Sequence, residues 1–117
     1  MSKGKVLLAE DDLSLSFVIK DNLQDADYEV THCPDGEVAW QQFQKKEFDI
    51  CLLDVNMPVR DGFSLAKKIR QISDIVPILF ITAKSMESDK ITGFKTGADD
   101  YITKPFSMQE LLMRMDV

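Results

Sequence analysis

The 117-residue sequence is poor in the residues that cross-link secreted proteins or bind zinc. It contains two cysteines and one histidine. Neither Cys33 nor Cys51 belongs to a close cysteine or histidine grouping of the kind that binds zinc. Cys51 lies within an apolar run, where a thiol behaves as a small hydrophobe. We therefore expect free thiols rather than a disulfide, as is usual in a reducing compartment.

Long hydrophobic runs are also missing. No apolar segment approaches the roughly 20 residues that span a bilayer. Residues 1–5 lead directly into a short apolar run, unlike the start of a signal peptide. The default location is therefore the cytoplasm, and we expect no membrane partner.

Positive charge is in the minority, with 14 lysines and arginines against 20 acidic residues and a net charge of −6. Gripping nucleic acid by its phosphates requires a basic surface, so we expect no direct nucleic-acid contact. The composition, 44% hydrophobic and 29% charged, is otherwise that of an ordinary globular protein. Residues 1–117 are enough for one domain with a substantial core.

Short apolar segments alternate with helical patterns along the whole chain. The segments that we predict as strands are 6–9, 28–32, 50–54, 78–82 and 101–103. Helices are predicted from residue 13, after the turn at 34–36, after residue 61, over 85–94, and after a capping box at 107–110. This alternation predicts a doubly wound α/β fold, with a five-stranded parallel sheet and helices on both faces.

Three aspartates beside these elements are assigned structural roles. Asp12 and Asp61 precede predicted helices and are expected to cap them. Asp99 is expected to act in a similar structural way. The first helix is expected to bury an apolar stripe at helical spacing, made of Leu15, Val18, Ile19 and Leu23.

Polar residues follow four of the five predicted strands. They are Glu10, Asp11 and Asp12, then Asp54, Thr82 and Lys104. The carboxyl ends of parallel strands lie at one edge of a sheet, which is where ligands bind in such folds. Each residue alone has an ordinary explanation as a helix cap, a strand residue or a solvated cation. Their occurrence at four strand ends predicts one functional site.

The acidic residues of this set predict a hard divalent cation. Carboxylates that lie close together raise one another's pKa unless a cation neutralises them. Oxygen ligands without histidine or cysteine select Mg²⁺ over zinc, and Mn²⁺ would also fit. Asp11 and Asp54 are expected to bind the metal directly, together with the backbone carbonyl of Asn56. Glu10 is assigned a role through metal-bound water.

Asp54 is the predicted nucleophile of the site. A carboxylate can attack phosphorus and become an acyl phosphate. Phosphoryl transfer otherwise depends on positioning and charge neutralisation. Lys104 offers a compact cation for one phosphoryl oxygen, and the Thr82 hydroxyl can donate to another.

Four segments carry a family resemblance: residues 6–12 (VLLAEDD), 53–62 (LDVNMPVRDG), 81–84 (ITAK) and 97–106 (GADDYITKPF). The chain resembles the receiver domain of bacterial two-component response regulators. This resemblance implies a flavodoxin-like sheet with strand order 2-1-3-4-5 and a cis Lys104–Pro105 peptide. It also implies that Asp54 accepts its phosphoryl group from a phosphohistidine of a sensor histidine kinase or phosphotransfer protein. Such a domain is a regulatory switch that catalyses only its own phosphorylation and dephosphorylation.

The resemblance further implies a switch formed by Thr82 and Tyr101. On phosphorylation the Thr82 hydroxyl moves toward the phosphoryl group, and the Tyr101 ring turns inward into the space it leaves. An aromatic residue at this place alone would be an ordinary edge-strand residue, but the surrounding DYITKPF sequence favours the switch. The helix predicted at 85–94 has a thin apolar face, as expected of a mobile element. Together with the fifth strand and the last helix, it forms the expected output surface.

A finer resemblance is to receivers of winged-helix transcriptional regulators. Such receivers pair through the output surface by self-complementary charges. The residues that would pair here are Lys90, Asp99, Asp100, Glu110 and Arg114. A charged face exposed to solvent is the alternative. No output domain is recognisable in the 117 residues. We expect either a receiver that belongs to a longer regulator, which we favour, or a stand-alone one. In the first case DNA binding would be a property of the part outside these residues.

Two other functions were weighed against the switch. Phosphatases with an aspartyl nucleophile carry a second aspartate two residues later as general acid, but Asn56 occupies that position and cannot exchange a proton in that role. An interaction module without phosphorylation chemistry would not need the full set of acids with Thr82 and Lys104. The switch remains the leading hypothesis.

Overall fold

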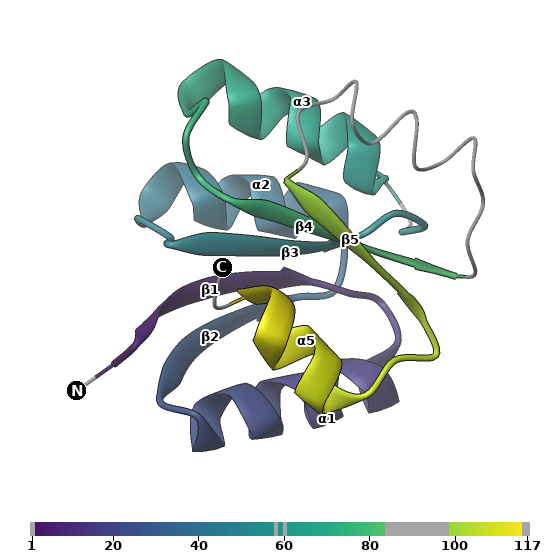
Figure 1. Cartoon of the computed structure of the whole chain (residues 1–117). Helices are drawn as coiled ribbons and strands as arrows, with labels where there is room; N and C mark the ends of the chain where they lie inside the picture. Colours follow the sequence, from purple (N-terminus) through teal and green to yellow (C-terminus); the bar gives the residue numbers. More distant parts are fainter. Residues whose placement is uncertain (1, 58, 60, 84–98, 116–117) are drawn as a thin grey trace.

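The computed structural model describes residues 2–57, 59, 61–83 and 99–115. Five parallel strands form one sheet in the order β2-β1-β3-β4-β5, which confirms the predicted topology (Figure 1). The strands are β1 (Gly4–Ala9), β2 (Tyr28–Cys33), β3 (Ile50–Asp54), β4 (Ile78–Ala83) and β5 (Asp100–Lys104). The helices in the described part are α1 (Leu13–Asp25), α2 (Gly36–Lys45), α3 (Gly62–Ile72) and α5 (Met108–Met115). The helix predicted at 85–94 lies outside the described residues.

Helices cover both faces of the sheet, with α2 and α3 on one face and α1 and α5 on the other (Figure 1). Alternation along β1 sorts its side chains between two cores. Leu7 and Ala9 belong to the cluster that also holds residues of α2 and α3. Val6 and Leu8 belong to the cluster that holds residues of α1 and α5. Strands buried on both faces explain the unbroken apolar runs in the sequence.

The predicted caps of α1 and α3 are present. The Asp12 carboxylate accepts a hydrogen bond from the backbone N–H of Leu15, and Asp61 accepts one from Ser64 at 2.7 Å. Ser107 caps α5 in the same way, by accepting from the backbone N–H of Glu110. Side-chain oxygens thus satisfy N–H groups that the first turn of a helix leaves without partners.

The predicted apolar stripe of α1 was wrong at one position. Ile19 and Leu23 are fully buried, but Val18 is 48% exposed, and Ser16 is buried in its place. The Ser16 hydroxyl donates to the backbone carbonyl of Leu13, so a small polar side chain can be buried without losing its hydrogen bond. Positions 16, 19 and 23 lie on one side of the helix, whereas position 18 points away from that side.

Helix α3 begins against the backbone of β3. A Cβ on Gly62 would lie 2.3 Å from the carbonyl oxygen of Asp54 and 3.0 Å from the Cα of Val55. The N–H of Gly62 donates to the carbonyl of Val55 at 3.0 Å. Only glycine permits this approach, which places the first residue of α3 directly against the backbone at the end of β3.

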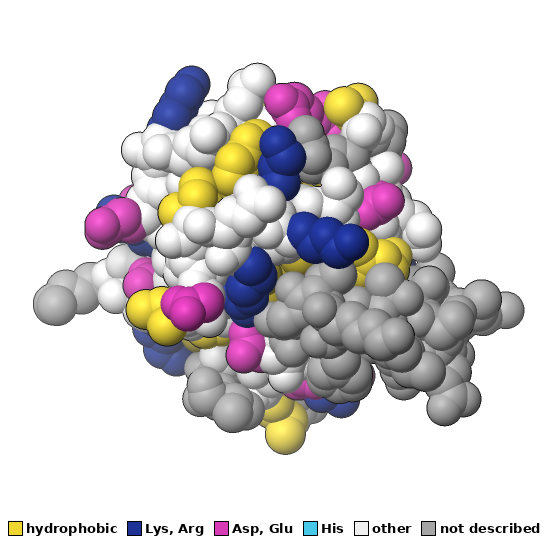
Figure 2. All heavy atoms as spheres, turned by 90° about the horizontal axis from the view of Figure 1, so that it is seen from above, with side chains coloured by type: hydrophobic (Ala, Val, Ile, Leu, Met, Phe, Trp, Pro, Cys, Tyr) yellow, Lys and Arg dark blue, Asp and Glu magenta, His cyan; other side chains and the backbone are white. Residues whose placement is uncertain are grey.

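The surface on the α3 side carries mixed charge. On the face seen in Figure 2, the described lysines and arginines are interspersed with acidic and apolar side chains rather than gathered into one basic patch. Among the helices of the described residues, none combines the length and apolar character required to cross a bilayer.

Candidate functional site

Three carboxylates meet at the carboxyl edge of the sheet. Glu10 and Asp11 follow β1, and Asp54 ends the neighbouring strand β3, with Ala9 in register with Leu53. One oxygen of each carboxylate lies within 4.8 Å of an oxygen of the other two. Parallel pairing of the two strands therefore brings together acids that are more than 40 positions apart in the sequence, as predicted.

Asp54 is the buried centre of this cluster. Its residue exposure is 3%. The backbone N–H of Asn56 donates to Oδ1 at 3.1 Å, and Nζ of Lys104 donates to Oδ2 at 3.4 Å. Each carboxylate oxygen thus has a donor beside it, which fixes the orientation of the side chain.

Glu10 is fully buried beside Asp54. Its Oε2 accepts a hydrogen bond from the backbone N–H of Asp12, and Oε1 lies 3.2 Å from Nζ of Lys104. Burial raises the pKa of Glu10 to about 7, and the adjacent Asp54 carboxyl adds to this rise. The opposing effects of the Asp12 N–H and of Lys104 are weaker. The site therefore disfavours the charged form of Glu10, and Lys104 does not fully offset this effect.

Lys104 is the cation of the cluster and comes from the end of β5. Burial alone would lower its pKa, but the negative charges of Asp54 and Glu10 outweigh burial and raise it. Lys104 is therefore an ammonium ion at neutral pH. The Lys104–Pro105 peptide is cis, as the resemblance implied.

Thr82 and Tyr101 occupy adjacent strands next to this cluster. Thr82 on β4 is fully buried and lies one position beyond Ile81, the register partner of Asp54. Tyr101 on β5 is 6% exposed, and its ring centroid is 6.1 Å from that of Phe80. The Tyr101 side chain is therefore buried next to the Phe80 ring.

The charges predicted to pair between chains have partners within one chain. Arg114 contacts both oxygens of Asp100, at 3.0 and 2.8 Å, and its Nε lies 3.3 Å from Glu110. Asp99 accepts hydrogen bonds from the backbone N–H of Ile78 at 2.9 Å and from Arg70 at 3.2 Å, so it contacts the start of β4 and a side chain of α3 rather than capping a helix. Lys90, the fifth predicted residue, lies outside the described part of the chain.

Two residues that shape the site were not predicted. Gly62 permits the close approach of α3 to Asp54, and the adjacent Asp61-Gly62 pair suggested only a turn and a cap. His32 at the end of β2 contacts the backbone carbonyl of Glu10 at 2.8 Å. No local pattern marks His32, because its partner lies 22 positions away on another strand.

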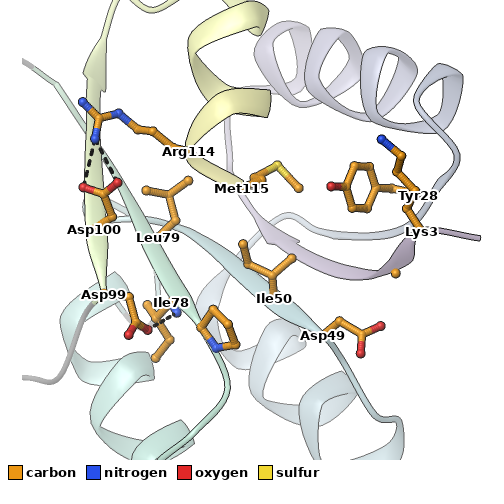
Figure 3. Close-up of a pocket in the computed structure, with 12 residues that line it drawn as sticks. Lys3, Tyr28, Asp49, Ile50, Ile78, Leu79, Asp99, Asp100, Arg114 and Met115 are labelled. Carbon is orange, nitrogen blue, oxygen red and sulfur yellow. Dashed lines mark hydrogen bonds and ion pairs between the residues drawn. The ribbon is translucent and has the colours of Figure 1, made fainter. Parts of the chain in front are cut away.

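A separate cavity of about 480 Å³ lies at the opposite edge of the sheet (Figure 3). The amino ends of β1, β2, β3, β4 and β5 border it, together with the end of α5. The Arg114–Asp100 ion pair lies at one side of the cavity, and Lys3 and Tyr28 lie at the other (Figure 3). Because the acidic cluster lies at the carboxyl edge, this cavity is not part of the candidate site.

The donor set of the acidic cluster fits a divalent cation. It offers carboxylate oxygens at close mutual distances, which is the ligand type that Mg²⁺ prefers. Oε1 of Glu10 is buried and has no hydrogen-bond partner among the described residues, although Lys104 lies near it. A buried oxygen left in this state is unusual unless a further ligand completes it.

Comparison with known proteins identifies relatives over nearly the whole chain. The sequence model of the response regulator receiver domain family matches residues 6–116. The transcriptional regulatory protein RprY of Bacteroides fragilis is 46% identical over 114 residues, which are 97% of this chain and 48% of that protein. The chain spans about half the length of the curated relatives that it matches.

Solved structures agree with this result. The chemotaxis response regulator CheY4 of Vibrio cholerae superposes with a TM-score of 0.92 at 37% identity, covering 99% of this chain and 97% of that one. The receiver domain of the sensor histidine kinase PA1611 from Pseudomonas aeruginosa superposes with a TM-score of 0.89 at 32% identity, covering 97% of this chain and 94% of that one. That structure has a magnesium ion coordinated in the active site cleft.

Proposed function

Since the chain belongs to the response regulator receiver family, whose role is regulatory, we propose that Asp54 is the residue on which the switch is phosphorylated. The donor would be a phosphohistidine of a sensor histidine kinase or of a phosphotransfer protein. A bond forms between an Asp54 carboxylate oxygen and phosphorus while the bond from phosphorus to the histidine nitrogen breaks. The donor imidazole leaves and keeps the electron pair of the broken bond.

The residues around Asp54 support this transfer by position and charge. The Asn56 N–H holds Oδ1, and Lys104 Nζ lies near Oδ2. After transfer, Lys104 can pair with one phosphoryl oxygen, and the Thr82 hydroxyl can donate to another. Burial of Asp54 and Thr82 keeps competing water away from these contacts.

The acidic cluster would hold Mg²⁺, with Mn²⁺ as a substitute. Asp11 and Asp54 would bind it directly, with the backbone carbonyl of Asn56, and Glu10 would act through a metal-bound water. The bound ion supplies charge neutralisation for the carboxylates and the incoming phosphoryl oxygens. The observation that carries the proposal is the convergence of Glu10, Asp11 and Asp54, two of which, Glu10 and Asp54, also contact the Lys104 ammonium.

Labelling with acetyl phosphate and Mg²⁺, followed by intact-mass measurement, tests this proposal. The native chain is expected to gain the mass of one phosphoryl group. Asp54→Asn and a sample in excess chelator should gain none. Asp61→Asn is the matched control, because Asp61 caps α3 in the segment that follows Asp54 and should not affect the chemistry. Equal labelling of Asp54→Asn would refute the assignment, and so would an unlabelled native chain that is folded.

The proposed output is an altered surface formed by β5, α5 and the helix predicted at 85–94. This surface would control a DNA-binding domain, as the names of the transcriptional regulators among the relatives suggest. A cavity of about 580 Å³, lined by residues of β5 and α5 with Pro105, hollows the described part of it. The chain itself, with its net charge of −6, is not proposed to contact DNA.

Pairing of two chains through the same surface is part of this proposal. Arg114 would exchange its contacts with Asp100 and Glu110 for the same residues of a second chain. These residues are partly exposed, and such ion pairs contribute about 0–1 kcal/mol each, so the exchange costs little. Sedimentation before and after phosphorylation should show a dimer in the phosphorylated sample. Arg114→Glu should remain monomeric, and a native chain that stays monomeric when phosphorylated would refute the pairing.

We place the domain in the cytoplasm. Cys33 and Cys51 are both free and buried in the structure. Unpaired thiols fit a reducing compartment.

A further inference from the structure

The only histidine of the chain lies beside the acidic cluster without belonging to it. His32 is half-buried near the end of β2, paired in register with Leu8 of β1. Its Nε2 lies 2.8 Å from the backbone carbonyl oxygen of Glu10. Because a carbonyl oxygen only accepts hydrogen bonds, the ring must carry a proton on Nε2.

This contact fixes one particular peptide group. The carbonyl of Glu10 and the N–H of Asp11 belong to the same planar unit. Rotation of that unit would redirect the Asp11 side chain and the backbone of Glu10 together. A donor on the Glu10 carbonyl therefore orients two of the three carboxylates that form the cluster.

Two more hydrogen bonds hold the same residue. The backbone N–H of Glu10 donates to the carbonyl of Cys33 at 3.1 Å, which continues the pairing of β1 with β2 beyond the strand end. The Glu10 side chain accepts from the backbone N–H of Asp12 at 3.1 Å. Glu10 is thus held through its N–H, its carbonyl and its carboxylate, and β2 supplies the partners of the first two.

We propose that His32 is a positioning residue for the cation site. Its Nε2–H fixes the Glu10–Asp11 peptide so that the carboxylates are already arranged when the ion arrives. A site that is ordered in advance loses less conformational freedom on binding, so its affinity is higher. The inference rests on the proposed function, because it assigns His32 a role in binding the Mg²⁺ that phosphorylation requires.

Two substitutions separate the hydrogen bond from the packing of the ring. His32→Phe keeps an aromatic ring but has no donor, whereas His32→Gln keeps an N–H donor on a flexible chain. Loss of a residue that orients a metal ligand typically weakens binding about 10- to 100-fold. His32 acts through the backbone, so we expect Mg²⁺ affinity of His32→Phe to fall about tenfold by calorimetry. His32→Gln should stay within about threefold of the native chain.

Thr31→Ala is the matched control. Thr31 precedes His32 on β2, and alternation directs its side chain to the other face of the sheet. This variant should bind Mg²⁺ as the native chain does. Urea unfolding of all variants shows whether each is folded under the conditions of the titration.

Amide hydrogen exchange in metal-free protein gives a second readout. The amides of Glu10 and Asp12 should exchange faster in His32→Phe than in the native chain, while amides in the middle of β3 stay unchanged. The inference is overturned if His32→Phe, once folded, keeps native Mg²⁺ affinity and native exchange, or if His32→Gln is impaired as strongly as His32→Phe. A native chain that fails to bind Mg²⁺ would instead refute the proposed function, and the exchange data would still decide the role of His32.

Discussion

Replacing Gly62 with alanine tests whether the close contact between α3 and β3 sets the position of Asp54. The new Cβ would lie 2.3 Å from the carbonyl oxygen of Asp54. Heavy atoms in contact are normally about 3.5 Å apart, so an atom must move by about 1 Å. The obstacle is backbone rather than the end of a flexible side chain. Either α3 moves outward or the peptide after Asp54 rotates.

Both responses carry a cost that can be estimated. Forcing an extra methyl group into a packed site costs about 1–3 kcal/mol. Alanine is the better helix former by up to about 1 kcal/mol, which offsets part of this loss. We therefore expect the free energy of unfolding to fall by about 1–2 kcal/mol. Because a 1 Å displacement of a reacting group can cost about 100-fold in rate, labelling of Asp54 by acetyl phosphate should slow at least about tenfold.

Urea unfolding and the rate of mass gain measure the two effects separately. Gly4→Ala is the control, because the atoms nearest to a Cβ on Gly4 belong to the Asp49 side chain, at 3.3 Å and beyond, and not to backbone. Its unfolding free energy should change by no more than about 0.5 kcal/mol, and its labelling rate should not change. If Gly62→Ala matched this control in stability and rate, the contact would not position Asp54.

Two further predictions concern other parts of the fold. The Arg70 guanidinium donates to the carbonyl of Val76 at 2.7 Å and to Asp99 at 3.2 Å. Arg70→Ala should therefore lower the free energy of unfolding, measured in urea, by about 2–3 kcal/mol. Lys67→Ala is the control and should change it little, because Lys67 is exposed. Burial raises the pKa of Cys33 to about 11 and that of Cys51 to about 12. Unfolded thiols ionise near pH 9, so the contribution of the two thiols to stability should be constant below that pH. Between that pH and their folded pKa values it should be lost, by up to about 1.4 kcal/mol per pH unit for each thiol. A Cys33→Ala, Cys51→Ala chain should lose that part of the slope, and an unchanged slope would contradict the reasoning.

The strand pattern could be predicted from the sequence because it depends on local composition. The run from Ile50 to Asp54 is buried at every position, so its apolar character appears directly in the sequence. The caps at Asp12 and Asp61 were predictable for the same reason, since each acts on its own helix within three residues. Val18 was predicted wrongly because helical spacing alone does not show which way the helix is turned on the sheet.

The acidic cluster was predictable from a rule of topology. Parallel strands end at one edge, so Glu10, Asp11 and Asp54 had to approach one another once the strand order was known. Gly62 and His32 were not predictable in this way. Their roles depend on a contact distance to backbone atoms of Asp54 and Glu10, and a sequence pattern carries no information about such distances.

Charge explains why a site of this composition suits a switch. Among the residues that the structure describes, fully ionised Glu10, Asp11 and Asp54 carry three negative charges against the single positive charge of Lys104, which leaves −2 in a partly buried space. A divalent cation would cancel this excess, and the incoming phosphoryl group would then add negative charge beside Lys104 and Thr82. Because these charges are poorly screened by water, each addition changes the local energy strongly. If Asp54 is phosphorylated as proposed, this change in charge beside Thr82 is the physical cause that would drive the proposed movement of Thr82 and Tyr101.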